Sequence, residues 1–190
     1  MRLIEAHGMV VDDERPWLGG YFPDGDPSSF CPELWEWALK RFKIKSMIDV
    51  GCGSGQALAW FETRGCDVLG VDGLPPAGDA RIVDHDYTLG SYTPNRSFDL
   101  CWSCEFVEHI EQEFIPNFLA TFKAAKIVMM THGQPWQDGH HHVNCHVSDY
   151  WIEKLADAGF SFLARLSIKS RDLVLHQYWG RSGLIFRNRA

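Results

Sequence analysis

A short apolar segment that runs into a glycine-rich turn constrains this sequence more than any other feature. Residues Met47–Val50 are apolar except for Asp49, and glycines then occupy positions 51, 53 and 55. Because glycine has no Cβ, such a turn lets the chain reverse sharply and lets a ligand approach the backbone N–H groups that open the next helix. The helical pattern of Gln56–Thr63 follows and stops before Gly65. This part of the sequence predicts a strand, a ligand-binding turn and a helix.

Strand and helix patterns alternate along the rest of the chain. Further strands are predicted at Val68–Asp72, Arg81–Val83, Phe98–Trp102 and Ile127–Thr131, and helices at Glu33–Phe42, around residues 112–125, and at Asp149–Ala158 with Ser148 as its cap. Two last strands, Phe160–Ile168 and Gly183–Phe186, have no helix predicted between them, so we expect them to pair antiparallel or to lie apart. The alternation favours an α/β fold, a mostly parallel sheet of about seven strands with the last strand antiparallel and helices on both faces.

The chain length fits one compact domain. At 190 residues it can bury a sizeable core, and nothing in the composition indicates a second one. Residues 1–30 are rich in Gly, Pro and Asp, and we expect them to form an irregular arm packed against the core. The prediction is a single domain over residues 1–190, with an N-terminal arm and helix (1–45) and a core (46–190).

No apolar run is long enough for a membrane span and no signal peptide is evident, so we expect a cytoplasmic protein without a membrane partner.

Charge and cysteine content narrow the function further. The formal net charge of −7 argues against a nucleic-acid partner, because such binding rests on clustered Lys and Arg. The six cysteines are expected to be reduced thiols in a chain without a secretory signal. Cys101 and Cys104 have the spacing of a thiol redox motif, but Cys101 falls inside an apolar strand, so we expect no redox role.

Two motifs together carry a family resemblance. Residues 49–55 have the pattern D-x-G-x-G-x-G, and residues 98–110 begin with Phe-Asp and end with Glu-His-Ile. The first resembles motif I of class I S-adenosylmethionine-dependent methyltransferases, and the second resembles their fourth-strand motif. The resemblance covers roughly residues 46–160 and implies a Rossmann-like three-layer sandwich; residues 25–35 are similar to bacterial and phage-borne members of uncertain substrate. One departure is Ala124-Ala125-Lys126, which replaces the K-P-G-G turn of the family before the fifth strand.

The resemblance implies S-adenosylmethionine as the cofactor, bound at the carboxyl edge of the sheet. Expected contacts are the turn residues Asp49, Gly51, Cys52, Gly53 and Gly55, the strand-end residues Asp72 and Gly73, the group Asp84, His85 and Asp86, and the pair Ser103 and Cys104. Asp72 would accept hydrogen bonds from the ribose hydroxyls. Asp84 or Asp86 would contact the adenine amino group, unless both serve only in turn formation.

Methyl transfer from a sulfonium requires the acceptor and the methyl carbon to be held in line, and a hydroxyl acceptor also needs a proton acceptor. We assign His109 and His142 as the catalytic residues, because imidazole titrates near neutral pH. His109 could instead bond a backbone group at a helix start. Glu105 and Glu108 are alternatives for contact with the substrate.

The segment Asp138–His146 follows the fifth predicted strand, and five of its nine residues are histidine or cysteine. His140 and His142 could share a face and, with Asp138 or His146, bind a divalent metal. The spacing matches no closed zinc site, so we assign no metal ligands, and a solvated loop remains the alternative. His142-Val143-Asn144 resembles an H-x-N sequence common here in the family.

Four aromatic residues flank these motifs, namely Trp17, Tyr21, Phe22 and Trp136. They are expected to pack in the core or to form a wall over the sulfonium or the acceptor. The predicted function is S-adenosylmethionine-dependent O-methylation of a small molecule or saccharide, with a sugar oxygen as the first choice. The alternatives are a noncatalytic protein that binds S-adenosylmethionine or S-adenosylhomocysteine and an NAD-dependent oxidoreductase, and a homodimer is left open.

Overall fold

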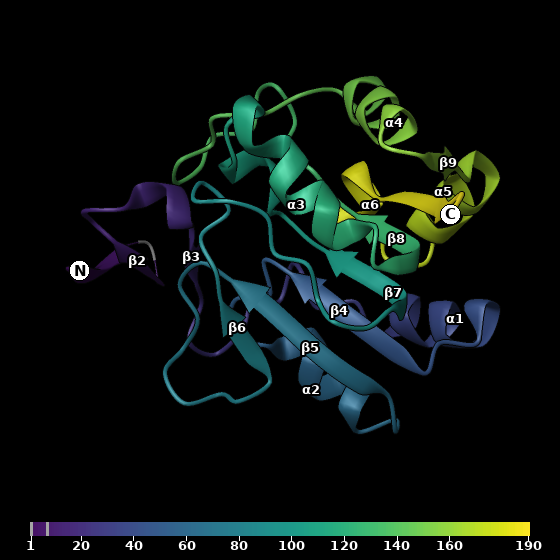
Figure 1. The fold of residues 1–190 in the computed structure, drawn as a ribbon, viewed down its shortest axis with the longest axis horizontal. Coiled ribbons are helices and arrows are strands. Elements are labelled where there is room, and N and C mark those ends of the chain that lie inside the picture. The colour runs from purple at the N-terminus through teal and green to yellow at the C-terminus, as the bar shows by residue number, and fades with distance from the viewer. Residues whose placement is uncertain (1, 7) are drawn as a thin grey trace.

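A seven-stranded sheet forms the centre of the computed structural model, which describes residues 2–6 and 8–190 (Figure 1). Its strands are β4 (Ser46–Val50), β5 (Asp67–Asp72), β6 (Ile82–Asp84), β7 (Phe98–Ser103), β8 (Ala125–Met130), β9 (Phe160–Phe162) and β10 (Leu184–Asn188). They lie in the order β6-β5-β4-β7-β8-β10-β9. The first five are parallel, whereas β10 runs antiparallel to both β8 and β9. The predicted mostly parallel sheet with an antiparallel last strand is confirmed.

The order of the strands reverses direction at β4. The chain adds β5 and β6 on one side of β4 and then returns to add β7 on its other side. In an open parallel sheet, the loops after the strands diverge at such a point and leave a crevice at the carboxyl ends. The glycine turn follows β4 directly, so it lies at that crevice.

Helices cover both faces of the sheet. One core contains residues of α1 (Pro32–Phe42), α2 (Gln56–Glu62) and α6 (Tyr178–Ser182), and the other contains residues of α3 (Ile115–Phe122) and α4 (Ser148–Asp157). Side chains of a strand alternate between faces, and in β7 Trp102 belongs to the first core and Cys101 to the second. Figure 1 shows α3 in front of the sheet and α2 behind it. Among the described residues, no helix has the length and apolar character needed to cross a bilayer.

The N-terminal arm is more regular than predicted. Apart from Met1 and His7, which lie outside the described residues, it contains β1 (Leu3–Ala6), β2 (Met9–Asp12) and β3 (Gly20–Tyr21) in an antiparallel sheet, with a 3-10 turn, η1 (Pro16–Leu18). The interpretation as an irregular arm was wrong because buried polar contacts stabilise it. Asp12 is fully buried, and its carboxylate accepts hydrogen bonds from Arg15 at 2.8 Å and from the Glu14 backbone at 3.1 Å.

The predicted strand Phe160–Ile168 was also wrong beyond Phe162. The chain continues as α5 (Ala164–Arg171) and then α6, so two helices separate β9 from β10, although these strands do pair antiparallel. Ser167 is the reason, because its hydroxyl donates to the Leu163 carbonyl at 3.1 Å and accepts from the Ile185 N–H at 2.9 Å. Because a polar serine occupies a buried position of α5, the segment lacks the regularly spaced apolar residues from which a helix is predicted.

The predicted cap of α4 is a further correction. Ser148 is the first helical residue and makes no capping hydrogen bond with its side chain. Its hydroxyl lies 3.0 Å from Nε2 of His132 instead. The side chain of Ser148 thereby joins α4 to the loop after β8. The prediction of a helix cap was wrong because the actual partner of Ser148 is distant in the sequence.

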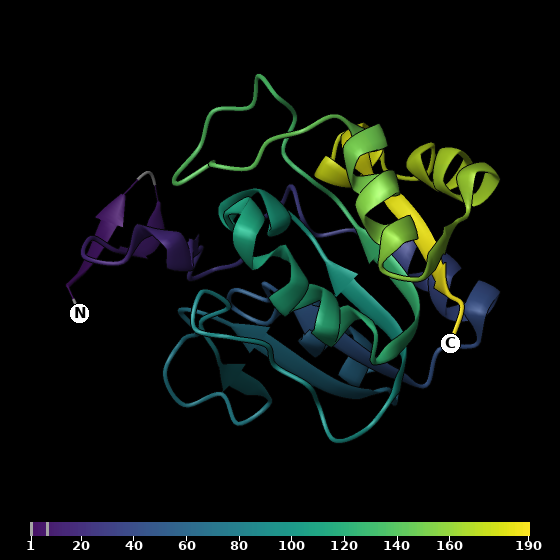
Figure 2. The same cartoon turned by 45° about the horizontal axis from the view of Figure 1, so that its top comes forward.

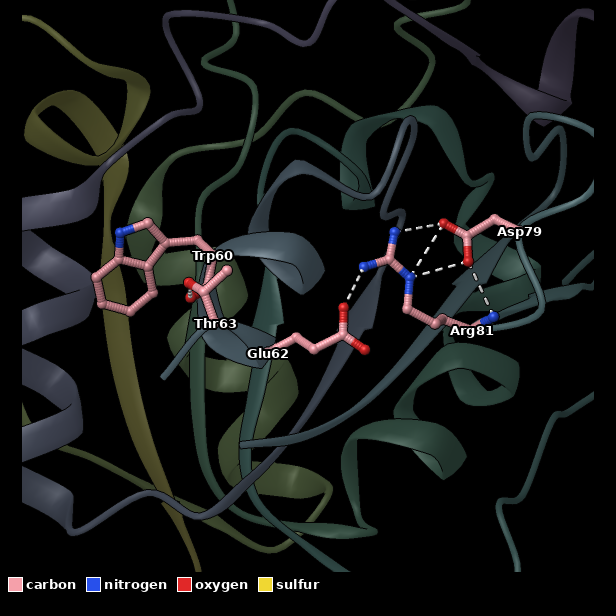
Figure 3. A network of polar contacts seen from close by, with 5 residues as sticks. All are labelled: Trp60, Glu62, Thr63, Asp79 and Arg81. Atoms are coloured by element: carbon pink, nitrogen blue, oxygen red, sulfur yellow. Dashed lines mark hydrogen bonds and ion pairs between the residues drawn. The ribbon is translucent and has the colours of Figure 1, made fainter. Parts of the chain in front are cut away.

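A polar network holds β6 at the edge of the sheet. The guanidinium of Arg81 bonds Asp79 at 2.6 Å and Glu62 of α2 at 2.9 Å, while Thr63 donates to the Trp60 carbonyl at 2.8 Å (Figure 3). These ion pairs are partly exposed, and such pairs contribute about 0–1 kcal/mol each. The network therefore orients the loop between β5 and β6 against α2 more than it stabilises the fold.

The core on the α6 side gives a test of this fold. Trp179 is fully buried, stacks on Trp102 with ring centroids 5.3 Å apart, and donates its indole N–H to Ser170 at 3.0 Å. Trp179→Ala is expected to lower the free energy of unfolding, measured in urea, by about 3–5 kcal/mol because it leaves a cavity. Leu175→Ala, at a side chain that is 64% exposed, is the control and should change it by less than about 0.5 kcal/mol. A loss below about 1 kcal/mol for Trp179→Ala would contradict this packing.

Candidate functional site

Two neighbouring cavities lie at the carboxyl ends of the parallel strands. The larger, of about 250 Å³, is lined by the glycine turn, by Tyr21 and by the loop of residues 137–142. The smaller, of about 50 Å³, is lined by Asp72 and Gly73 at the end of β5 and by Trp17 and Leu18 of the N-terminal arm. Both cavities border Gly51 and His109. We call them the larger and the smaller cavity below.

The glycine turn leaves backbone exposed to the larger cavity. Gly51 has φ of 76°, and a Cβ on it would lie 2.6 Å from Phe106, so the turn accepts no side chain there. Gly53 has φ of 51° and faces Tyr21, with the larger cavity beside it. Gly55 precedes α2 but lines neither cavity. The turn is thus shaped for close approach at Gly51 and Gly53 and for helix initiation at Gly55.

Asp72 ties the glycine turn to the neighbouring strand. Its two carboxylate oxygens accept hydrogen bonds from the backbone N–H groups of Gly53 and Leu74, both at 2.8 Å. Burial raises the pKa of Asp72 to about 6 despite these bonds. Asp49, at the end of β4, also borders the larger cavity, and burial together with the charge of Asp72 raises its pKa well above the usual range. Two buried acids therefore meet beside the turn.

The residues expected near an adenine divide into two groups. Asp86 and His85 border the smaller cavity; Asp86 accepts the indole N–H of Trp17 at 3.0 Å, and His85 lies 3.0 Å from the Gly90 carbonyl. Asp84 is exposed and lines neither cavity. The arm thus covers the end of the site at which Asp86 lies.

The two residues at the end of β7 also differ. Cys104 borders the larger cavity. Ser103 is fully buried, donates its hydroxyl to the Val50 carbonyl at 2.9 Å, and lines neither cavity. The side chain of Ser103 therefore joins β7 to β4 across the crevice.

Glu105, His109 and His142 form the opposite wall of the larger cavity, and Glu108 is buried beside them without lining it. Glu108 lies in η2 (Val107–His109) and is fully buried, and neither of its carboxylate oxygens has a hydrogen-bond partner. His109 follows it, and loss of hydration lowers its pKa to about 3, so its imidazole is neutral. Its ring stands at 83° to that of His142, with centroids 4.9 Å apart. Glu105, at φ of 52°, bonds Thr131 and Gln137.

Backbone contacts bring His142 to this group from a distant part of the chain. The N–H groups of Val143 and Asn144 both donate to the Glu108 carbonyl at 3.0 Å, and the Asn144 amide donates to the Ile110 carbonyl at 2.9 Å. Figures 1 and 2 show the loop between β8 and α4 reaching toward the N-terminal strands. The sequence named His142 and Asn144 as a motif but could not show which residues they meet.

The remaining residues of interest are dispersed. His141 lies 3.2 Å from Glu111, and His146 stacks on Tyr150, so Asp138, His140, His142 and His146 do not converge on one point among the described residues. Of the four aromatic residues, Tyr21 and Phe22 line the larger cavity and Trp17 lines the smaller one. Trp136 is 79% exposed and lines neither cavity.

This chain has a Rossmann-like methyltransferase fold, as shown by the reversal of strand order at β4, the glycine turn and the acid after β5. The family model described as methyltransferase domain matches residues 26–171. The chain belongs to this methyltransferase-domain family, which confirms the resemblance found in the sequence.

Comparison with solved structures agrees on the fold. The sugar N-methyltransferase KedS8 from Streptoalloteichus sp ATCC 53650 is 16% identical, with 88% of this chain and 91% of that chain covered and a TM-score of 0.65. A TehB-like SAM-dependent methyltransferase from Corynebacterium glutamicum ATCC 13032 Kitasato is 18% identical, with 87% and 90% covered and a TM-score of 0.62. DesVI of Streptomyces venezuelae is 15% identical, with 86% and 93% covered and a TM-score of 0.61. A search of curated proteins found no match.

The raised pKa of Asp72 predicts a pH dependence of stability. Because the pKa in the folded protein, about 6, exceeds the ordinary value of 3.8, the folded form keeps the proton longer than the unfolded chain does. This contribution to stability is fully present below about pH 4 and is lost as the pH rises through 6. The free energy of unfolding of wild type relative to Asp72→Asn should therefore fall between pH 4 and 7, on the order of 3 kcal/mol.

Urea unfolding across this pH range measures the difference. Asp157→Asn, at an exposed aspartate of α4, is the matched control for the same chemical change. A pH-independent difference between wild type and Asp72→Asn would show that Asp72 is not buried as described.

Proposed function

We propose that this chain is an S-adenosylmethionine-dependent methyltransferase that acts on a small molecule or a saccharide, with O-methylation as the reaction. The observation that carries the proposal is the composition of the larger cavity. A glycine turn of the methyltransferase type forms one wall, and His109 and His142 lie in the opposite wall. A cofactor and an acceptor bound to these two walls would face each other across one space.

The residues present fit the cofactor. Gly51 and Gly53 leave room that a Cβ would occupy, and the Asp72 carboxylate at the end of β5 is an acceptor for hydroxyl groups. S-adenosylmethionine supplies a methyl group on a positively charged sulfur. In this proposal, the cofactor contacts are Asp49, Gly51, Cys52 and Gly53 in the turn, Asp72 and Gly73 after β5, His85 and Asp86 at the smaller cavity, and Cys104 after β7.

The arm has a part in this arrangement. Leu18 lies where a Cβ on Gly73 would be 3.0 Å away, and Trp17 bonds Asp86. The arm would exclude water from the cofactor, as methyl transfer requires. Residues 1–190 would act as one domain for this purpose.

The acceptor would be a hydroxyl group held near the histidines. A neutral imidazole can take the proton that a hydroxyl loses as its oxygen is methylated. His142 is the favoured proton acceptor, because a pKa of about 3 makes His109, which stands beside it, a weak base. A sugar is the favoured acceptor: the structurally similar KedS8 is named as a sugar N-methyltransferase.

A substitution in the turn tests the cofactor site. Gly53→Arg is expected to weaken binding of S-adenosylhomocysteine at least about tenfold, because the new side chain would fill the larger cavity. Calorimetric titration measures the affinity. Gly65→Arg is the matched control, since Gly65 also has a positive φ, of 76°, but has open space around it. Unchanged affinity in Gly53→Arg would show that the cofactor binds elsewhere.

Transfer of labelled methyl groups from S-adenosylmethionine tests the activity. With a fractionated cell extract as acceptor, label is expected in the saccharide or small-molecule fraction and not in nucleic acid or protein. His142→Ala should lower the rate about 100-fold while leaving the affinity for S-adenosylhomocysteine unchanged. His146→Ala, which changes a histidine of the same loop that stacks on Tyr150, should retain the rate.

The other outcomes separate the alternatives. Label in nucleic acid or protein would overturn the acceptor class. Tight binding of S-adenosylhomocysteine without transfer to any fraction would favour a noncatalytic binding protein, and binding of NAD alone would favour an oxidoreductase.

A further inference from the structure

Unpaired polar atoms are concentrated beside the larger cavity. Within the described residues, nine buried side-chain nitrogen and oxygen atoms lack a hydrogen-bond partner, and five of them belong to Glu108, His109, Glu111 and His140. An unsatisfied buried polar group costs about 1–3 kcal/mol. Because four side chains of one region carry most of this cost, the region has the properties of a binding site rather than of a packed core.

Glu108 and His109 of this region converge with His142 of the loop between β8 and α4. One carboxylate oxygen of Glu108 and one ring nitrogen each of His109 and His142 lie within 4.8 Å of one another. Ligands at about 2.1 Å from a divalent cation are separated by about 3–4 Å, so shifts of about 1 Å would bring all three into coordination. Glu108 is fully buried and neither of its oxygens makes a well-formed hydrogen bond; the Glu105 carboxyl group and the Gly133 backbone are its polar neighbours, so only these contacts would have to yield to a cation.

We propose that Glu108, His109 and His142 bind a divalent cation in the wall of the larger cavity. Two imidazoles and one carboxylate favour Mn²⁺, Fe²⁺, Co²⁺ or Zn²⁺ over Mg²⁺ and Ca²⁺, which prefer oxygen ligands. Three protein ligands leave coordination positions open. His109 and His142 line the larger cavity, so the open positions face the space available to a substrate.

The surroundings of the three ligands favour the same conclusion. Nδ1 of His142 lies 3.1 Å from the Gln137 carbonyl, which is the kind of contact that orients a metal-binding imidazole. The Glu108 carbonyl holds the loop of His142 through two backbone N–H groups, so the ligands are connected through the backbone. The carboxyl groups of Glu105 and Glu108 are in contact, and a cation bound to Glu108 would lower the repulsion between them.

This ligand set differs from the one suggested by the sequence, which was His140 and His142 with Asp138 or His146. His146 is occupied by stacking on Tyr150, with centroids 3.8 Å apart, and by a 3.0 Å contact with Gln112. His142 is therefore the residue of the loop that serves the cation, and its partners come from η2.

The proposal of a cation site does not depend on the proposed function, but the role of the cation described next does. If the chain methylates a hydroxyl, a cation with open positions would bind that oxygen and lower its pKa. His109 and His142 would then hold the cation, and the proton that the hydroxyl loses would pass to a water molecule instead of to an imidazole.

Titration with Co²⁺ tests the site directly, with neither S-adenosylmethionine nor acceptor present. The full chain is first treated with a chelator and dialysed, and Co²⁺ is followed by its visible absorption, which intensifies when imidazole replaces water as a ligand. Wild type is expected to bind one equivalent. Glu108→Gln and His142→Ala should each weaken binding at least about tenfold. His146→Ala and His176→Ala, at histidines outside the group, should bind as wild type does.

Thermal unfolding gives a second readout. Co²⁺ should raise the melting temperature of wild type but not of Glu108→Gln, and without Co²⁺ this variant should be at least as stable as wild type because it removes a buried unpaired carboxylate. If Glu108→Gln fails to fold, His142→Ala at the partly buried loop carries the test alone. Absence of binding at millimolar Co²⁺, or equal binding by His142→Ala and wild type, would overturn the proposal whether or not the chain transfers methyl groups.

Discussion

The hydrogen bond between the Gly53 N–H and the Asp72 carboxylate is the contact on which the rest of the site depends. It fixes the turn after β4 against the end of β5, the neighbouring parallel strand. The conformation of the turn keeps side chains out of the larger cavity, and the position of Asp72 places an acid at the boundary with the smaller one. The arrangement is costly, because burial raises the pKa of both Asp72 and Asp49. A fold that retains buried acids at such a cost has the properties of a functional site.

The two walls of the larger cavity are built in different ways. The wall with the glycine turn is local, since β4, the turn and α2 are consecutive in the chain. The wall with the histidines is nonlocal, because the Glu108 carbonyl must receive the N–H groups of Val143 and Asn144 before His142 can stand beside His109. The arm then closes the smaller cavity through Trp17 and Asp86. The walls that we propose for the cofactor and for the acceptor thus have separate structural origins.

This difference explains how much could be predicted from the sequence. The parallel strands and the glycine turn follow from apolar periodicity and from glycine spacing, which are local signals. The helix α5 was missed because Ser167 is buried for its hydrogen bonds, and the sheet of the arm was missed because buried Asp12 interrupts its apolar pattern. Glu108 was predicted only as an alternative contact; its unpaired carboxylate depends on the packing of a loop more than 30 residues away, which no sequence pattern shows.

Calorimetric titration of the wild-type chain with S-adenosylhomocysteine and, separately, with NAD tests the central claim most directly. The structure described here predicts one equivalent of S-adenosylhomocysteine bound and no binding of NAD at the same concentrations. Absence of S-adenosylhomocysteine binding, or tighter binding of NAD, would contradict the assignment of the glycine turn and Asp72 to a methyl-donor site.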